Sequence, residues 1–201
     1  MTLVKPFAAI RPKRELAEEI AALPYDVYSR KEACAEIKKH PMSFLRIDRP
    51  ETNFDDSVGT YDDRVYKKAN ELLWKMVEDG EFIREEEPRY YVYELTWKDV
   101  CESGIVGCVS VDDFEDGTVK KHENTRAEKE EDRIRHIDAV NAQTGPIFLA
   151  HKKNHTIAEI IGRTKKLKKP IYEFTTDGGV TNRVFVVDDG RDIDNISFAF
   201  S

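Results

Sequence analysis

The sequence predicts an α+β fold, with a mixed, largely antiparallel sheet, hairpins and flanking helices. Two observations lead to this prediction. Strand-like and helix-like segments are mixed along the chain, and the strand-like segments recur as hairpins. A hydrophobic content of 40% supplies enough apolar side chains for a core. A mixed-sheet α/β fold is the alternative. Because we find no repeat or linker, we expect a single domain over residues 1–201.

The N-terminal part of the chain begins with a short predicted strand over residues 3–12 and a helix over residues 14–23. Ser29 and Glu32 have the S-x-x-E spacing of a capping box, in which each residue bonds the backbone of the other. This spacing predicts a second helix, which ends before Pro41.

The middle of the chain holds the clearest helical pattern. Residues 43–47 form a short apolar run that we interpret as a buried strand, and a polar loop follows over residues 49–59. Residues 61–80 then predict an amphipathic helix that Gly80 terminates. Its apolar face consists of Tyr61, Val65, Ala69, Leu72, Leu73 and Met76.

Two hairpins dominate the rest of the chain. The first joins strands over residues 89–97 and 104–111 through residues 98–103. The second joins strands over residues 171–176 and 182–189 through an Asp-Gly-Gly turn. The other predicted elements are a strand over 146–151, a helix over 156–167 and an amphipathic helix that begins at 191.

Composition narrows the class of protein. A net charge of −7 and a pI near 5.4 argue against nonspecific nucleic-acid binding, which needs basic surface to displace counterions. Cys34, Cys101 and Cys108 include no CxxC pair, so we expect reduced thiols in a cytoplasmic protein. The N-terminus lacks the apolar stretch of a signal peptide, and no apolar run reaches the ~18 residues needed to span a bilayer.

The densest charge of the chain lies in residues 119–146. Thr125 and Glu128 repeat the capping-box spacing, so we expect a helix that begins at Arg126. At about 100° per residue, one stripe of this helix carries Arg126, Lys129, Arg133 and His136. We expect Ala127, Ile134 and Ile137 on the adjoining buried face. The outward face holds Glu128, Glu131, Asp132, Arg135 and Asp138.

This basic stripe has two interpretations. It borders the buried face, where a row of cations favours a multivalent anion such as phosphate, and the helix N-terminus adds backbone donors. His122 and Glu123 precede the helix, where a carboxylate can serve as a base or a metal ligand. Alternatively, the helix is a solvated one whose cations pair with its own acids at i+3 and i+4 spacing.

Three other segments are weaker candidates. Residues 122–126 read HENTR and are not an HExxH motif, because Arg126 stands where a second histidine is required; we therefore do not expect zinc. The acidic residues within 111–117 are candidates for holding Mg²⁺, although acidic turns are common at strand ends. Asn141, Gln143 and Thr144 can bind a small polar substrate or simply form the loop after the helix.

Several blocks of the sequence resemble the domain-of-unknown-function 1015 family, in that family's order and over essentially the whole chain. They read PYDVYSRKEA, HPMSFLRIDRPE, YDDRVYKKANELL, GCVSVDDFEDGTVKKHENTRAEKEEDRIRHI and NAQTGPIFLAH. The chain departs from the family pattern at Leu23, where a proline is usual. It also resembles only the N-terminal half of roughly twice-longer members, so we expect that part of an active site is contributed by a missing C-terminal half.

The resemblance implies an activity and a site. The family is linked to free-serine kinases, which use a nucleotide or pyrophosphate donor, and to the ParB/sulfiredoxin fold. The implied catalytic residues are Glu123 and His122, with Mg²⁺ as cofactor. The implied phosphate-binding residues are Lys121, Arg126, Lys129 and Arg133, with Asp132 among the matching positions. Asn141, Gln143 and Thr144 are the implied substrate-binding residues.

Three functional hypotheses follow from the residues and the resemblance together, and the third is a purely structural partner domain whose cations pair internally. The first is a small-molecule phosphotransferase that takes a phosphate donor and an amino-acid acceptor, with no nucleic-acid or membrane partner. The second is a non-catalytic regulatory module that binds a nucleotide or phosphate at the same basic stripe. Only the first needs a carboxylate at the reacting oxygen.

Overall fold

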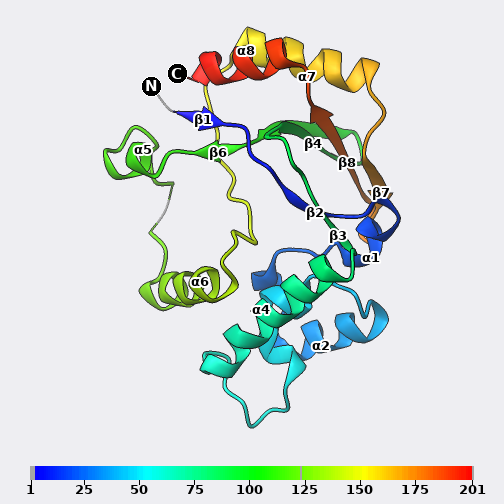
Figure 1. Cartoon of the computed structure of the whole chain (residues 1–201), viewed down its shortest axis with the longest axis vertical. Coiled ribbons are helices and arrows are strands. Elements are labelled where there is room, and N and C mark those ends of the chain that lie inside the picture. The colour runs from blue at the N-terminus through cyan, green and yellow to red at the C-terminus, as the bar shows by residue number, and fades with distance from the viewer. Residues whose placement is uncertain (1–2, 123, 201) are drawn as a thin grey trace. The chain divides into compact units, whose positions relative to one another are not determined.

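The computed structural model describes residues 3–122 and 124–200, and its contacts divide the chain into two compact units (Figure 1). Unit 1 consists of Met1–Arg14, Arg84–Glu123 and Ala150–Ser201. Unit 2 consists of Glu15–Ile83 and Asn124–Leu149. The expectation of a single domain over the whole chain therefore stays a prediction.

Unit 1 is built on a four-stranded antiparallel sheet with the strand order β5-β4-β8-β7. The sheet consists of β4 (Tyr90–Trp97), β5 (Val100–Val106), β7 (Tyr172–Thr175) and β8 (Val180–Val187). In the centre of the sheet, Val92 of β4 lies opposite Ile105 of β5 and Phe185 of β8. Helices and antiparallel strands together confirm the α+β class.

Both predicted hairpins are present, but the first turn is tighter than expected. Trp97 pairs with Val100, so only Lys98 and Asp99 form the turn, and Lys98 adopts a positive φ of 53°. The prediction that residues 98–103 connect the strands was wrong, because residues 100–103 belong to β5 and pair with β4. The second hairpin turns through the predicted Asp-Gly-Gly, where Gly179 has a φ of 75°.

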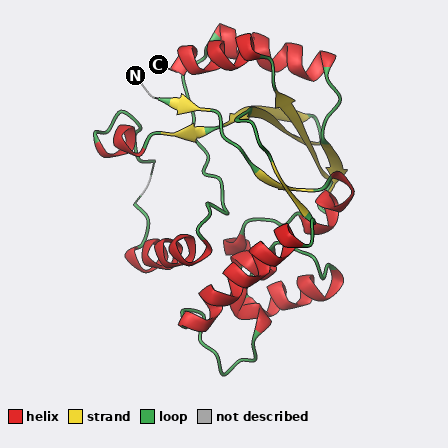
Figure 2. Ribbon diagram, viewed as in Figure 1, coloured by secondary structure: helices red, strands yellow, loops and turns green. Residues whose placement is uncertain are grey.

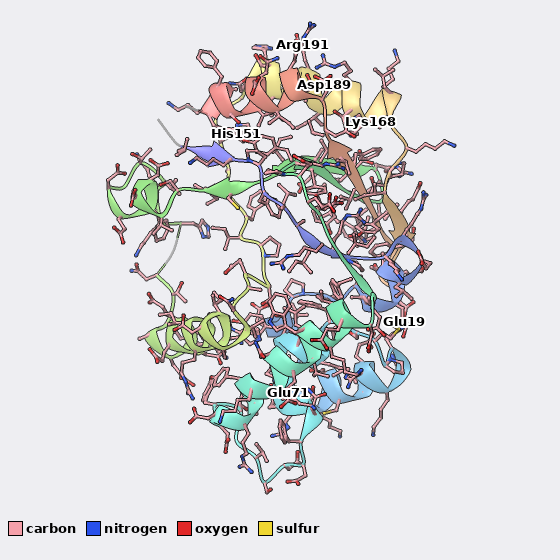
Figure 3. All side chains as sticks on the ribbon, in the orientation of Figure 1. Glu19, Glu71, His151, Lys168, Asp189 and Arg191 are labelled. Atoms are coloured by element: carbon pink, nitrogen blue, oxygen red, sulfur yellow. The ribbon has the colours of Figure 1, made fainter. Side chains whose placement is uncertain are left out.

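Two helices pack along one face of this sheet, as Figure 1 and Figure 2 show. They are α7 (His155–Leu167) and α8 (Gly190–Phe200), both close to their predicted bounds. The core between helices and sheet consists of Val4, Tyr90, Val92, Ile160, Phe185, Val187 and Ile196. At the end of α7, Lys168 (labelled in Figure 3) donates to the Val186 carbonyl at 3.1 Å and pairs with Asp188.

Short elements complete unit 1. The predicted strand over residues 3–12 is two strands, β1 (Val4–Lys5) and β2 (Ile10–Pro12). β1 pairs antiparallel with β6 (Cys108–Val109), and the single-turn helix α5 (Val111–Glu115) follows β6. In α5 the acidic side chains serve local structure, since the Asp113 carboxylate accepts from the Leu3 backbone N–H at 2.6 Å.

The regular secondary structure of unit 2 is almost entirely helical, as the red segments of Figure 2 show. Its main helices are α2 (Arg30–Lys39), α4 (Asp63–Glu78) and α6 (Ala127–Val140). Shorter elements are a 3-10 helix at Arg14–Leu16 (which begins in unit 1), α1 (Ala17–Ile20), 3-10 helices at Tyr25–Val27 and Pro50–Asn53, α3 (Leu45–Asp48) and β3 (Phe82–Arg84), which ends in unit 1. The core of the main helices consists of Ile47, Ala69, Leu73 and Val140.

The local signals in unit 2 were confirmed in two places. Ser29 and Glu32 form the predicted capping box at the start of α2, and the helix ends before Pro41. α4 buries Val65, Ala69 and Leu73 on its predicted apolar face.

Two predicted strands are absent from the structure. Residues 43–47 were predicted to be a strand, but the segment forms α3, in which Leu45 and Ile47 are fully buried. A short apolar run has no periodicity that separates a buried strand from one buried helical turn. Residues 146–151 form neither helix nor strand, and Phe148 is 89% exposed. That segment has no strand beside it in the described chain, and a strand needs a ladder partner.

The described helices were also compared with what a bilayer crossing requires. None of those in residues 3–122 and 124–200 is both long enough and apolar enough to span a membrane.

Candidate functional site

Unit 2 encloses a cavity of about 390 Å³, within the usual size range of small-molecule sites. Its wall comes from four places in the sequence: the 3-10 helix at Tyr25–Val27, α3 with the segment after it, α4 with the preceding loop, and α6. The described lining residues are Tyr25, Asp26, Tyr28, Asp48, Arg49, Pro50, Glu51, Thr60, Tyr66, Arg126, Lys129, Asp132 and Arg133. Four lining side chains are basic and four are acidic, so the cavity suits a highly polar ligand.

Three of the basic side chains come from the beginning of α6. Arg126 is the N-cap residue, and Lys129 and Arg133 follow at spacings of three and four residues, which places all three on one face of the helix. The helix begins at Ala127, one residue later than predicted, and the predicted cap was therefore wrong. Arg126, and not Thr125, holds the N-cap position, and no side-chain cap bond forms there among the described residues.

The buried face of α6 also differs from the prediction. Asp132 was expected to face outward, yet its side chain lines the cavity and the residue is only 6% exposed. Ile134 was expected on the buried face, yet it is 48% exposed. The helix is rotated relative to the expectation because Tyr66 of α4 supplies a partner for the Asp132 carboxylate at 2.8 Å. The buried residues of α6 are Asp132, His136 and Val140.

Arg133 is held from two sides inside the cavity wall. Its Nε and Nη2 donate to Oδ2 of Asp132 at 3.2 and 2.9 Å. Its guanidinium carbon lies 4.2 Å from the centre of the Tyr25 ring, a cation–π contact. The charge of Arg133 is thus partly compensated. Arg126 and Lys129 differ, since neither has an ion pair with another residue that the structure describes.

Asp48 is the lining carboxyl with the most unusual environment. Burial raises its pKa from 3.8 to about 6, although the Thr144 hydroxyl and the nearby Arg133 cation both act to lower it. Its Oδ1 is buried and has no hydrogen-bond partner in the described part of the chain. A carboxyl that titrates near neutrality and has a free oxygen in a cavity is typical of a general acid or base.

The opposite wall is built around Arg49. Its Nε donates to Glu51 at 2.7 Å, and its Nη1 donates to the carbonyls of Tyr25 and Tyr28 at 3.2 and 2.5 Å. Glu51 is almost fully buried and therefore needs this partner. Arg49 consequently fixes the loop that carries Tyr25 and Tyr28, and we assign it a structural role.

His136 lies behind the cavity and has a structural role as well. It is fully buried, and its Nε2 donates to the Ile47 carbonyl at 2.8 Å, so the ring proton resides on Nε2. Burial lowers its pKa, and Arg133 lowers it further, which keeps the ring neutral. Because Ile47 precedes Asp48, this bond anchors the end of α3 that carries the carboxyl.

The predicted site residues are only partly brought together. Arg126, Lys129 and Arg133 line the cavity, and Thr144 lies beside Asp48. Among the other predicted residues, Asn141 ends α6 with a φ of 55°, and Gln143 donates to the Gly145 carbonyl at 2.9 Å.

The remaining predicted residues precede α6. Lys121 and His122 belong to unit 1, where Lys121 lies 5.0 Å from the Phe114 ring. Glu123 lies outside the described residues.

The sequence interpretation missed the aromatic and acidic wall of the cavity. Tyr25, Asp48, Arg49 and Glu51 lie in the blocks PYDV and RIDRPE, which were recognised only as family signatures. Their signal was the density of charge in residues 46–51 directly after an apolar run. An apolar run places the next residues at the edge of the core, where charged side chains need partners.

Metal ligation was examined over the same residues. Residues 3–122 and 124–200 contain no group of three or more His, Cys, Asp or Glu arranged to hold a metal ion. Mg²⁺ needs fewer protein ligands when substrate phosphates supply the others. Asp26 and Asp48 are the lining carboxyls that do not bond an arginine. Asp26 is the one that fits a phosphate-bound Mg²⁺, because burial favours the uncharged form of Asp48.

Fold and site together define an α+β protein with a small, highly charged cavity. A family model described as "Protein of unknown function (DUF1015)" matches residues 4–201, and the chain therefore belongs to this family. No curated protein and no solved structure matches the chain.

Proposed function

We propose that the cavity of unit 2 is the phosphoryl-transfer site of a small-molecule kinase. A pyrophosphate or nucleotide donor binds to the cations of α6, and a free amino acid with a hydroxyl group is the acceptor. Serine is the acceptor that the family resemblance favours. The proposal rests on one observation: Arg126, Lys129 and Arg133 line the same cavity as Asp48, whose pKa is raised to about 6.

The two kinds of group suit the two halves of the reaction. Phosphoryl transfer requires that the negative charge on the donor be neutralised and that the acceptor oxygen be held in line with the phosphorus. Arg126 and Lys129 can bind donor phosphate oxygens through charge-assisted hydrogen bonds. Arg133 lies near Asp48 and can contact the phosphoryl group that is transferred.

Asp48 is the proposed general base. Above about pH 6 it is a carboxylate, and its free Oδ1 can accept the proton of the acceptor hydroxyl. The acceptor oxygen then forms a bond to phosphorus as the bond between phosphorus and the donor's bridging oxygen breaks. The leaving phosphate departs with the electron pair of that bond. A bound Mg²⁺ would supply further charge neutralisation at the donor phosphates, with Asp26 as its protein ligand.

A second candidate function is a regulatory module that binds the same anion without turnover. It is favoured by two ion pairs, Arg133 with Asp132 and Arg49 with Glu51. Because of these pairs, two of the four basic side chains that line the cavity already have a carboxylate partner. The two candidates share the anion site but differ in whether Asp48 reacts.

The test measures O-phosphoserine formation by ³¹P NMR, with serine and either pyrophosphate, ADP or ATP as donor. We expect turnover with at least one donor and a loss of about 100-fold or more in Asp48→Asn, in which no base remains. Pyrophosphate affinity, measured by isothermal titration, should persist in this variant. The matched control is Asp138→Asn, an exposed carboxylate on α6 away from the cavity, which should leave turnover unchanged.

The regulatory alternative predicts a different pattern. Pyrophosphate binding that depends on Arg126, together with no turnover for any donor and acceptor pair, would support the binding module and reject the kinase.

A further inference from the structure

The cavity contains one cation whose side chain is held by its own neighbour in the sequence. On a helix, consecutive residues point in directions about 100° apart and do not normally pair. Arg133 nevertheless donates two hydrogen bonds to Asp132, so its guanidinium is folded back along the helix surface. This conformation places the guanidinium on the face of Tyr25, 4.2 Å from the ring centre.

Asp132 can hold Arg133 because it is itself fixed. Its Oδ1 accepts the Tyr66 hydroxyl at 2.8 Å, while its Oδ2 accepts both bonds from Arg133. Tyr66 is buried in the core of α4, where burial and the neighbouring Asp132 carboxylate raise the pKa of its hydroxyl. The hydroxyl therefore remains protonated and always donates to Asp132.

The opposite face of Arg133 is limited by Tyr25, which belongs to a different segment of unit 2. The loop of Tyr25 is in turn tied to Arg49 through the Tyr25 carbonyl. Arg133 is thus held by Asp132, which Tyr66 of α4 fixes in turn, and by the ring of Tyr25. Of its guanidinium nitrogens, Nη1 has no hydrogen bond within the described residues.

Asp48 shares the cavity lining with Arg133 and with other charged side chains, namely Asp26, Arg49, Glu51, Arg126, Lys129 and Asp132. Burial has the largest effect on the Asp48 pKa and raises it, whereas the Thr144 hydroxyl and the Arg133 cation lower it. Arg49 is paired with Glu51, so Arg133 is the cation whose position we expect to influence the ionisation of Asp48. A shift of Arg133 of a few ångströms changes that interaction, since the energy between two charges falls with distance.

We infer that Tyr66, Asp132 and Tyr25 are positioning residues that hold Arg133 beside Asp48, and that Arg133 serves mainly to adjust the proposed base, while Arg126 and Lys129 carry the donor phosphates. This inference rests on the proposed function for its catalytic meaning. The positioning itself is a statement about geometry and can be tested without turnover.

The experiment follows the ionisation of the Asp48 carboxyl by ¹³C NMR as a function of pH. Arg133→Gln removes the cation and should move the Asp48 titration midpoint upward by about one pH unit. Tyr66→Phe removes one hydroxyl and leaves the ring in place. It should move the midpoint in the same direction by a smaller amount, because Asp132 and then Arg133 are less firmly held. If turnover is observed, the acidic limb of its pH profile should shift with the NMR midpoint.

The matched control is Tyr61→Phe. Tyr61 also donates its hydroxyl to a carboxylate of α6, Glu128, at 2.9 Å, but that bond is exposed and Glu128 does not line the cavity. This variant should leave the Asp48 midpoint at its wild-type value. If Tyr66→Phe does not fold, Tyr25→Leu releases Arg133 from the other side at a partly exposed position, and the same upward shift is expected.

Each outcome decides the inference. If Arg133→Gln shifts the midpoint but Tyr66→Phe and Tyr25→Leu do not, these residues only stabilise the fold and the positioning role is wrong. If Arg133→Gln has no effect, Arg133 does not act on Asp48 and the inference fails as well. A wild-type protein that shows the expected shifts but no turnover would reject the proposed kinase and leave the positioning intact.

Discussion

Each of the two units contains a carboxyl in an unusual environment, and the two environments are opposite. Glu94 of β4 in unit 1 is only 3% exposed, and both of its oxygens are paired, one with Lys165 of α7 and one with Arg183 of β8 at 3.1 Å. Asp48 of α3 in unit 2 has a buried oxygen with no partner in the described chain.

The ionisation of the two groups follows from these partners. Burial alone raises the pKa of Glu94, but the hydrogen bonds from Lys165 and Arg183 outweigh it and leave the pKa below its usual value. At Asp48 burial is the larger effect, and the pKa rises to about 6. A carboxyl that only supports the fold is fully paired, whereas one that is kept partly unpaired at a cost in stability is a candidate for chemistry.

The largest effect is expected when an ion pair of Glu94, the fully paired carboxyl, is removed. Lys165→Met leaves Glu94 buried with Arg183 as its remaining strong partner, and we expect a loss of about 3 kcal/mol in the free energy of unfolding. Urea denaturation at pH 7 measures this loss. The control is Lys166→Met at the next, exposed position, which should change stability by less than about 0.5 kcal/mol. Equal stability of the two variants would show that the Glu94 pairs are not important for folding.

The next test concerns Asp48, the carboxyl with an unpaired oxygen, and here we expect the substitution to raise the free energy of unfolding. The folded-state pKa of Asp48 is raised from 3.8 to about 6, so its contribution to stability is complete below about pH 4 and is lost as the pH rises through 6. Asp48→Asn cannot ionise, and it should therefore be more stable than wild type by about 2–3 kcal/mol at pH 8.

This advantage should shrink to about 0.5 kcal/mol near pH 4, where the wild-type carboxyl is protonated in the folded state and about half protonated in the unfolded state. Urea midpoints at the two pH values provide the measurement. An Asp48→Asn variant that is no more stable at pH 8 than at pH 4, relative to wild type, would contradict the raised pKa.

A third test compares cations instead of carboxyls. Arg183 is occupied by Glu94 and Glu173, whereas Arg126 has no ion pair within the described residues. Arg126→Ala should therefore weaken pyrophosphate binding about tenfold, the effect of one lost charge-assisted hydrogen bond. Isothermal titration measures the affinity. Lys67→Ala, an exposed cation on α4 in the same unit, is the charge-matched control and should bind as wild type does.

The smallest test sharpens the geometry of the helix that carries these cations. Ser29 forms a complete capping box in the structure, but Thr125 lies outside the N-cap position of α6. Ser29→Ala should lower the free energy of unfolding by about 1 kcal/mol, and Thr125→Ala should change it by less than about 0.5 kcal/mol. Equal costs in thermal or urea unfolding would mean that α6 begins one residue earlier and that its cations face differently.

Local sequence signals predicted the elements whose stability is local. The apolar spacing of α4 and α7 and the Ser29–Glu32 box lie within a few turns of one helix, so each could be identified from neighbouring residues. The cations of the candidate site could be predicted for the same reason, because all three lie on one stretch of α6.

The remainder of the site depends on distant partners. Asp132 turns inward because the Tyr66 hydroxyl donates a hydrogen bond to its carboxylate, and the two residues are 66 positions apart in the sequence. The pKa of Asp48 depends on its burial and on Arg133 and Thr144, two residues that lie far from it along the chain. The interpretation of residues 43–47 as a strand also hid Asp48, because it left this residue between the strand and the loop, whereas the structure places it at the end of the helical turn α3.

The division of the chain into units has a consequence for how the protein can be inherited and dissected. The chain passes between the two units four times, at residues 14/15, 83/84, 123/124 and 149/150. The residues that line the cavity run from Tyr25 to Arg133, so any uninterrupted gene segment that encodes all of them also encodes residues 84–123 of the other unit. Recombination at a single junction cannot transfer the cavity without that middle segment. An exchange of the cavity between relatives as one segment therefore also replaces residues 84–123 of unit 1, while residues 1–14 and 150–201 of that unit can stay.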